Sequence, residues 1–342
     1  MELFFNTLYG MGVGNLVDVY LKGRVRQWFS LEIVSIDGQV HFYIWGFKGM
    51  KSRIESQLYA QFSNIEVHEV ADYALAVQRN PEVLSIGFIG QIVLTKASAY
   101  PIKTYVEYGL DKDAKEEYKH DPLVPLLEFF GSLKKGEQAW IQILIQAHGK
   151  EGIKLGRIFT KPDWKGDVEK EVKDFIKKNV PAVEGKDKQP TNKDLTKDQQ
   201  NVVAAIQRTV AKYPFDTMIR AAYIADKTAF NPTNIGGLLG SFAQFSSPAL
   251  NGFRPGFGAG YDYAWQDPTG KKKAENEEAL LEAYKRRSFF NTPFRHFHGS
   301  PYILTTEELA TLFHFPSAIV AATPTLTRLP SKKGQAPANL PI

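Results

Sequence analysis

Residues 28–47 read WFSLEIVSIDGQVHFYIWGF, and this stretch decides the fold class. Its two halves, 28–36 and 40–47, are rich in β-branched and aromatic residues, which are typical of strands. Asp37 and Gly38 lie between them, and an Asp-Gly pair favours a tight hairpin turn because glycine adopts positive φ without steric cost. The sequence therefore predicts an antiparallel hairpin over these residues.

Regular elements continue on the C-terminal side of this hairpin. Ile54, Leu58 and Phe62 recur at intervals of four residues, which predicts a helix with one apolar stripe. The remaining elements of this part are expected as a strand, a strand, a helix and a strand, at 65–70, 90–97, 121–131 and 140–148.

The strand expected at 140–148 alternates between isoleucines and glutamines. This alternation predicts one buried face and one solvent-exposed face, with Gln142 and Gln146 on the exposed side. If one strand of the first hairpin is set aside, the element order becomes βαββαβ, which is the ferredoxin-like arrangement. The fold class expected from the sequence is therefore α+β with a ferredoxin-like domain at 28–150.

A second α/β unit is expected at 195–316, for which another ferredoxin-like arrangement is one interpretation. Thr196 with Gln199, and Thr305 with Glu308, have the spacing of a helix capping box. We expect a strand at 215–226, helices after residue 231 and at 279–289, and a long glycine-rich loop at 252–270. The other segments are expected to be an N-terminal lead-in, a charged linker and an extended Pro- and Lys-rich tail, at 1–27, 151–194 and 317–342. Within the linker, an amphipathic helix at 168–176 is one interpretation.

The composition excludes several classes of protein. The chain has no cysteine, which excludes disulfides, Cys-ligated metal sites and thiol nucleophiles. Its net charge of +5 is compatible with an acidic partner without requiring one. Glu2 stands where a signal peptide carries positive charge, and no run of about 18 apolar residues occurs. We therefore expect a chain that neither crosses a membrane nor carries a signal peptide.

Motifs for nucleotide binding and nucleophilic catalysis are missing. The nearest match to a P-loop is the segment 131–136, but Glu137 follows it where a phosphate-binding lysine is required. Gly12 and Gly14 form a GxG that lacks the third glycine of a dinucleotide site. No G-x-S-x-G nucleophile motif occurs. The sequence predicts no catalytic residues of its own and no cofactor.

Two sets of residues remain as candidates for a binding site. Histidines at His296, His298 and His314 could hold a metal if the fold brought them together, although their aromatic neighbours also suit a packed interface. Basic residues with aromatic neighbours suit a groove for single-stranded nucleic acid, although a solvated surface explains them as well. These basic candidates are Lys271, Lys272, Lys273, Arg286 and Arg287.

Four runs of the sequence carry a family resemblance. They are QWFSLEIVSIDGQVHFYI, ESQLYAQFSNIEVHEV, YPIKTYVEYGLDKDAKEEYKHDPLVPLLEFFGSLKKGEQAWIQILI and ILTTEELATLFHFP, at 27–44, 55–70, 100–145 and 303–316. Together they resemble the region that precedes the P-loop ATPase domain in bacterial proteins related to type IV secretion and conjugative-transfer ATPases. The third run is the most specific of the four.

The resemblance implies a role without a reaction. It implies a cytoplasmic domain at the inner face of the membrane, with a P-loop translocation ATPase and a membrane secretion complex as partners. In that family the motor domain begins at about the position of residues 338–342. We therefore expect a non-catalytic docking or assembly domain, and self-association stays open. A single-stranded nucleic-acid-binding module and a metal enzyme based on the histidines are the alternatives.

Overall fold

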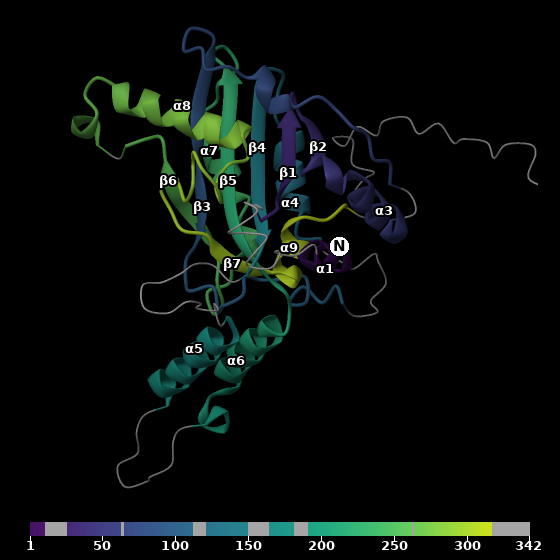
Figure 1. Ribbon diagram of the computed structural model, residues 1–342. Helices are drawn as coiled ribbons and strands as arrows, with labels where there is room; N and C mark the ends of the chain where they lie inside the picture. The colour runs from purple at the N-terminus through teal and green to yellow at the C-terminus, as the bar shows by residue number, and fades with distance from the viewer. Residues whose placement is uncertain are drawn as a thin grey trace, which may run out of the picture.

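One antiparallel sheet forms the centre of the molecule (Figure 1). The computed structural model describes residues 1–10, 26–62, 65–111, 121–149, 164–180, 191–261 and 263–316. Within these ranges the sheet has seven strands. Six of them lie in the order β2-β1-β4-β5-β3-β6, and β7 pairs with the part of β5 (214–217) that precedes its pairing with β3. The strands are β1 (Trp28–Ile36), β2 (Gln39–Trp45), β3 (Leu84–Leu94), β4 (Glu137–Ala147), β5 (Pro214–Asp226), β6 (Phe253–Gly258) and β7 (Tyr302–Thr305).

Helices cover both faces of this sheet, and two of them project away from it (Figure 1). The helices are α1 (Glu2–Gly10), α3 (Lys51–Gln61), α4 (Val124–Gly131), α5 (Trp164–Asn179), α6 (Lys197–Val210), α7 (Thr233–Gly240), α8 (Lys271–Lys285) and α9 (Thr306–Leu312). Within the described ranges, no helix combines the length and the apolar character that crossing a membrane requires.

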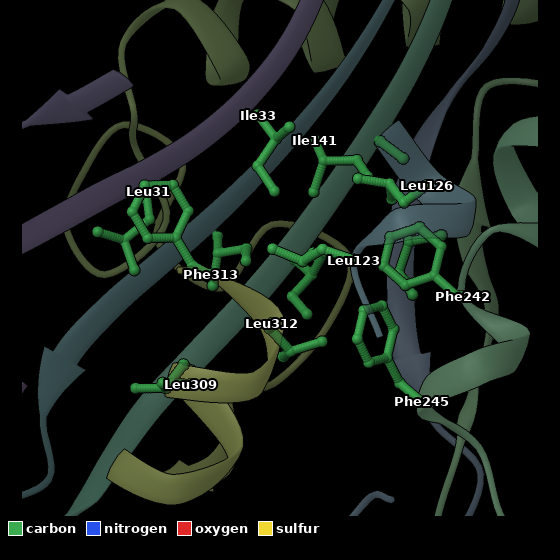
Figure 2. Packing of buried hydrophobic residues seen from close by; sticks show 14 of the residues in the cluster. Leu31, Ile33, Leu123, Leu126, Ile141, Phe242, Phe245, Leu309, Leu312 and Phe313 are labelled. Carbon is green, nitrogen blue, oxygen red and sulfur yellow. The ribbon is translucent and has the colours of Figure 1, made fainter. Parts of the chain in front are cut away.

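The larger core lies on the face covered by α1, α3, α4, α7 and α9. Alternate residues of the central strands, including Leu31, Ile33 and Ile141, point into it because side chains of a strand alternate between the two faces. Figure 2 shows these strand residues facing apolar side chains from the helices and their flanking segments. These partners are Leu123, Leu126, Phe242, Phe245, Leu309, Leu312 and Phe313.

The opposite face of the sheet is covered by α8, which crosses the central strands in Figure 1. Val34 and Trp140 of the sheet pack there against Leu281 and Tyr284 of α8. Because this helix lies over β4, Gln142 is also fully buried. The central strands are therefore buried on both faces.

The α+β class and the first hairpin are confirmed. Asp37 and Gly38 both have positive φ, of 55° and 79°, as an Asp-Gly hairpin turn requires. The capping boxes at Thr196 and Thr305 are also present. The ferredoxin-like subdivision is not confirmed, because β5 of the range 195–316 pairs with both β4 and β3 of the first range. Strands from both expected domains therefore share one sheet.

Other local predictions are wrong. Residues 65–70 form no strand, whereas the loop expected at 252–270 contains β6. The helix expected at 279–289 begins earlier and ends at Lys285. By contrast, the amphipathic helix that the sequence suggests at 168–176 is present, as part of the longer α5. Gln142 and Gln146 are buried, because a helix and its following segment cover the face that we expected to meet solvent. The expected tail at 317–342 and most of the lead-in, 11–25, lie outside the described residues.

Candidate functional site

The helices α5 and α6 form a hairpin that projects from the sheet (Figure 1). Trp164 and Val168 of α5 pack against Ile206 of α6, and the base of the hairpin contacts Ala99 and Leu250 of the main body. The apolar faces of the two amphipathic helices therefore pack against each other and, at the base of the hairpin, against the main body. The rest of the hairpin lies free of the sheet.

The two ends of the hairpin are closed by polar contacts. At the end away from the sheet, Gln199 Nε2 donates to Asn179 Oδ1 at 3.1 Å, which joins the end of α5 to the start of α6. The side chain of Thr196 caps α6 by accepting from the backbone N–H of Gln199. The first of these contacts joins the two helices at the end that lies away from the main body.

At the base, α6 is fastened to α9 by an ion pair. Arg208 donates from Nη2 to Glu307 Oε1 at 3.0 Å and from Nε to both carboxylate oxygens at 3.2 Å. Glu307 is almost fully buried, and Thr104 Oγ1 donates a further hydrogen bond to it at 2.7 Å. Arg208 also pairs with Glu107. An arginine that is partly buried and bonded through several nitrogens in this way fixes orientation as well as position.

The electrostatics of this junction favour the charged forms. Burial acts to raise the pKa of Glu107, but hydrogen bonds from Thr104 and Arg208 outweigh it and hold the pKa below its ordinary value. Burial acts to lower the pKa of Arg208, and its two carboxylate partners reverse that effect. The junction therefore consists of paired charges that attach the hairpin to α9.

The first helix joins the same junction. Glu2 of α1 pairs with Lys212 at 2.7 Å, and Tyr105 and Thr306 each donate a hydrogen bond to its carboxylate. Burial and the bond to Glu2 raise the pKa of Tyr105, which keeps its hydroxyl protonated as a donor. The hairpin base, α9 and α1 are therefore linked by one set of polar contacts.

One carboxylate of α9 differs from its neighbours. Glu308 is buried and accepts hydrogen bonds from the backbone N–H groups of Thr305 and Ile102, at 2.8 and 3.1 Å. Burial raises its pKa to about 7 against these hydrogen bonds. Its side chain is used as the capping-box partner of Thr305.

The histidine candidates lie in different settings. His314 follows α9, and its ring nitrogens contact Asp121 Oδ1 at 2.9 Å and a backbone carbonyl at 3.0 Å. His298 stacks on Phe257 with ring centroids 3.8 Å apart, and burial lowers its pKa. His296 packs near the ring of a buried phenylalanine. Among the residues that the structure describes, no three His, Asp or Glu side chains gather in a way that could hold a metal ion.

The basic candidates separate into an exposed and a buried group. Lys271, Lys272 and Lys273 form the first turn of α8 and are exposed, as is Arg286 at the other end of the helix. Arg287 is instead buried and is not free to bind a phosphate. The three lysines therefore lie together on the surface, whereas Arg287 is buried and separate from them.

Arg287 belongs to a buried charge network beneath α8. It pairs through Nε and Nη2 with the two oxygens of Glu32, at 3.0 and 3.1 Å, and also with Asp72. Glu32 accepts further hydrogen bonds from Tyr73 and Gln142. Burial acts to lower the pKa of Arg287, but the two carboxylates outweigh it and raise the pKa. The network ties the C-terminal end of α8 to β1.

Several residues of these sites escape detection in the sequence. Arg208 and Glu307 lie 99 residues apart, and Arg287 and Glu32 lie 255 apart, so no motif spacing connects them. The exposed aromatic residues before α8, Tyr263 and Trp265, do carry a signal, because they occur in a polar segment without large aliphatic residues.

These features define a class of protein, namely a single-sheet α+β protein that carries a projecting helical hairpin. Residues 20–327 match the family described as Domain of unknown function (DUF8128). Because this match covers most of the chain, the protein belongs to that family. No curated protein and no solved structure matches the chain.

Proposed function

We propose that this chain is a non-catalytic docking and assembly domain of a type IV secretion-like translocation ATPase, with the α5–α6 hairpin as its docking arm. The observation that carries the proposal is the projection of this hairpin from the sheet (Figure 1). The resemblance of the runs at 100–145 and 303–316 to the region before such motors supports the identity of the partner.

The surface of the arm suits a polar, reversible interface. Its apolar residues pack within the hairpin and at its base, so its outer face is charged. Exposed side chains of both signs alternate along α5, including Lys170, Lys173, Lys177, Glu169 and Asp174. Charge patterns of this kind fix the choice and orientation of a partner more than they add affinity.

The junction at the base gives the arm a mechanical role. A partner bound to α5 and α6 is connected to α9 through Arg208 and Glu307, and α9 is itself packed into the main core. The proposal places the domain in the cytoplasm at the inner face of the membrane, held there by a P-loop ATPase and a membrane secretion complex. Self-association is compatible with the same arm.

Co-purification of the full chain with a P-loop ATPase from the same organism tests the proposal. The triple variant Lys170→Glu, Lys173→Glu, Lys177→Glu should weaken the association about tenfold or more, because reversed charges oppose a complementary surface. The matched control Lys134→Glu, Lys135→Glu changes two exposed lysines outside the arm and should have no effect. Equal retention of both variants rules out the arm, and no association of the unmodified chain rules out the proposed function.

A further inference from the structure

Three aromatic side chains are exposed in the segment between β6 and α8. The exposed fractions are 43% for Tyr261, 60% for Tyr263 and 74% for Trp265. A cluster of large aromatic rings in water is unusual on a surface without a partner, because such rings dominate the energy of interfaces when they are covered. The cluster precedes the end of α8 that extends past the β6 edge of the sheet in Figure 1.

Hydrogen bonds order the backbone of the turn that carries these rings. The backbone N–H of Tyr263 donates to Gln266 Oε1 at 3.2 Å, and the N–H of Gln266 donates back to the carbonyl of Tyr263 at 3.0 Å. Asn276 of α8 donates to the Tyr261 hydroxyl at 3.2 Å. The rings of Tyr263 and Trp265 are nearly parallel, with planes 18° apart and centroids 6.2 Å apart. The turn therefore places two exposed, nearly parallel aromatic rings side by side.

Three lysines lie directly beside this turn. Lys271, Lys272 and Lys273 occupy the first turn of α8, where positive charge opposes the helix dipole. Asp267 accepts hydrogen bonds from the backbone N–H groups of Lys272 and Lys273, at 3.2 and 2.8 Å, so these amides are already used. The ammonium group of Lys272 donates to the Gln266 carbonyl at 3.2 Å, whereas those of Lys271 and Lys273 lie 3.9 and 3.8 Å from carboxylates of α8. These exposed ammonium groups are therefore the cations that an anionic ligand would meet.

We propose that Tyr263 and Trp265 stack on the bases of a single-stranded nucleic acid while Lys271, Lys272 and Lys273 contact its phosphates. Stacking rings beside a basic track are the arrangement by which proteins bind single strands without reading their sequence. The segment 260–270, GYDYAWQDPTG, contains two aspartates and no Val, Leu, Ile, Phe or Met. It therefore offers an anionic bilayer no large aliphatic side chain to insert, whereas Tyr263 and Trp265 offer bases flat aromatic faces.

This site is separate from the docking arm, so the two proposals stand independently. It also differs from the groove that the sequence suggests, since Arg287 and Phe289 are buried under α8. Of the basic residues expected to contact phosphate, the site keeps the three lysines at the start of the helix.

Fluorescence anisotropy of labelled oligothymidine, about 20 nucleotides long, titrated with the full chain tests the proposal. The unmodified chain should bind at about 50 mM salt and much more weakly at about 200 mM. Trp265→Ala and Tyr263→Ala should each weaken binding about tenfold. The triple variant Lys271→Ala, Lys272→Ala, Lys273→Ala should reduce the slope of log affinity against log salt by about 2.

The matched aromatic control is Tyr59→Ala, because Tyr59 of α3 is 50% exposed and lies outside this segment. It should bind as tightly as the unmodified chain. Equal binding by Trp265→Ala and the unmodified chain would overturn the proposal, as would no binding at low salt. Binding to phosphatidylserine vesicles without binding to the oligonucleotide would overturn it in favour of a membrane surface.

Discussion

Replacing Arg287 by methionine should destabilise the protein strongly. Arg287 bonds to both oxygens of Glu32, whose side chain has no exposure to solvent, and also to Asp72. Methionine replaces the aliphatic part of the arginine side chain without the guanidinium, on the same backbone, whose φ of 48° is unfavourable for both residues. The backbone strain therefore cancels in the comparison, and the loss of the guanidinium remains.

The magnitude follows from the carboxylate that is left behind. A buried charge without its partner costs about 3–5 kcal/mol, because desolvation is no longer offset by the ion pair. Glu32 keeps hydrogen bonds from Ser30, Tyr73 and Gln142, which favour the lower end of that range. We expect the free energy of unfolding to fall by about 3 kcal/mol.

Urea unfolding followed by tryptophan fluorescence measures this loss. The neighbouring Arg286→Met is a matched control, since Arg286 is 61% exposed and pairs with Glu282 at 3.5 Å. It should change the free energy of unfolding by less than about 0.5 kcal/mol. The double variant Glu32→Met, Arg287→Met should lose less than the sum of the two single variants. A loss below about 1 kcal/mol for Arg287→Met would refute the reasoning.

Two further predictions concern packing and pH. Gly237→Ala should lower the free energy of unfolding by about 1–3 kcal/mol, because the new Cβ would lie 2.4 Å from the ring of Phe129. The control Gly236→Ala places its Cβ in open space and should not destabilise the helix. Similar urea midpoints for the two variants would contradict this packing. Burial acts to raise the pKa of Asp121, but its bond to His314 prevails and lowers the pKa. The pair contributes stability at pH values above the ordinary pKa of 3.8, and this contribution is lost as the pH falls toward the lowered pKa. Asp121→Asn should therefore reduce the loss of stability at acid pH when unfolding is measured against pH. An unchanged loss at acid pH would exclude the pair as its source.

Local patterns predicted many elements of the fold correctly. The Asp37-Gly38 turn and the Thr196 and Thr305 caps depend on neighbours within a few residues, so the sequence shows them directly. The predicted α6 and β5 also form close to where we expected them. The strand expected at 65–70 does not form, so a short alternating pattern did not by itself specify a strand there.

The candidate sites were less accessible to sequence reasoning. Lys271, Lys272 and Lys273 are exposed as expected, but a basic residue beside aromatic ones, such as Arg287, has the same sequence pattern when it is buried. Only the partners of a charge distinguish a surface cation from a buried ion pair. The exposed aromatic pair, Tyr263 and Trp265, is the one feature of these sites that composition within a short segment indicates.

The sequence by itself determined the α+β class, the first hairpin and the capped helices, because these depend on side-chain periodicity and on short-range hydrogen bonds. Only the tertiary structure decided that β5 lies between β4 and β3, and that α8 covers Gln142. It also decided that Arg287 meets Glu32 across 255 residues. Such contacts depend on which strand edges and helix faces remain unpaired once the local elements have formed, and no local pattern encodes that choice.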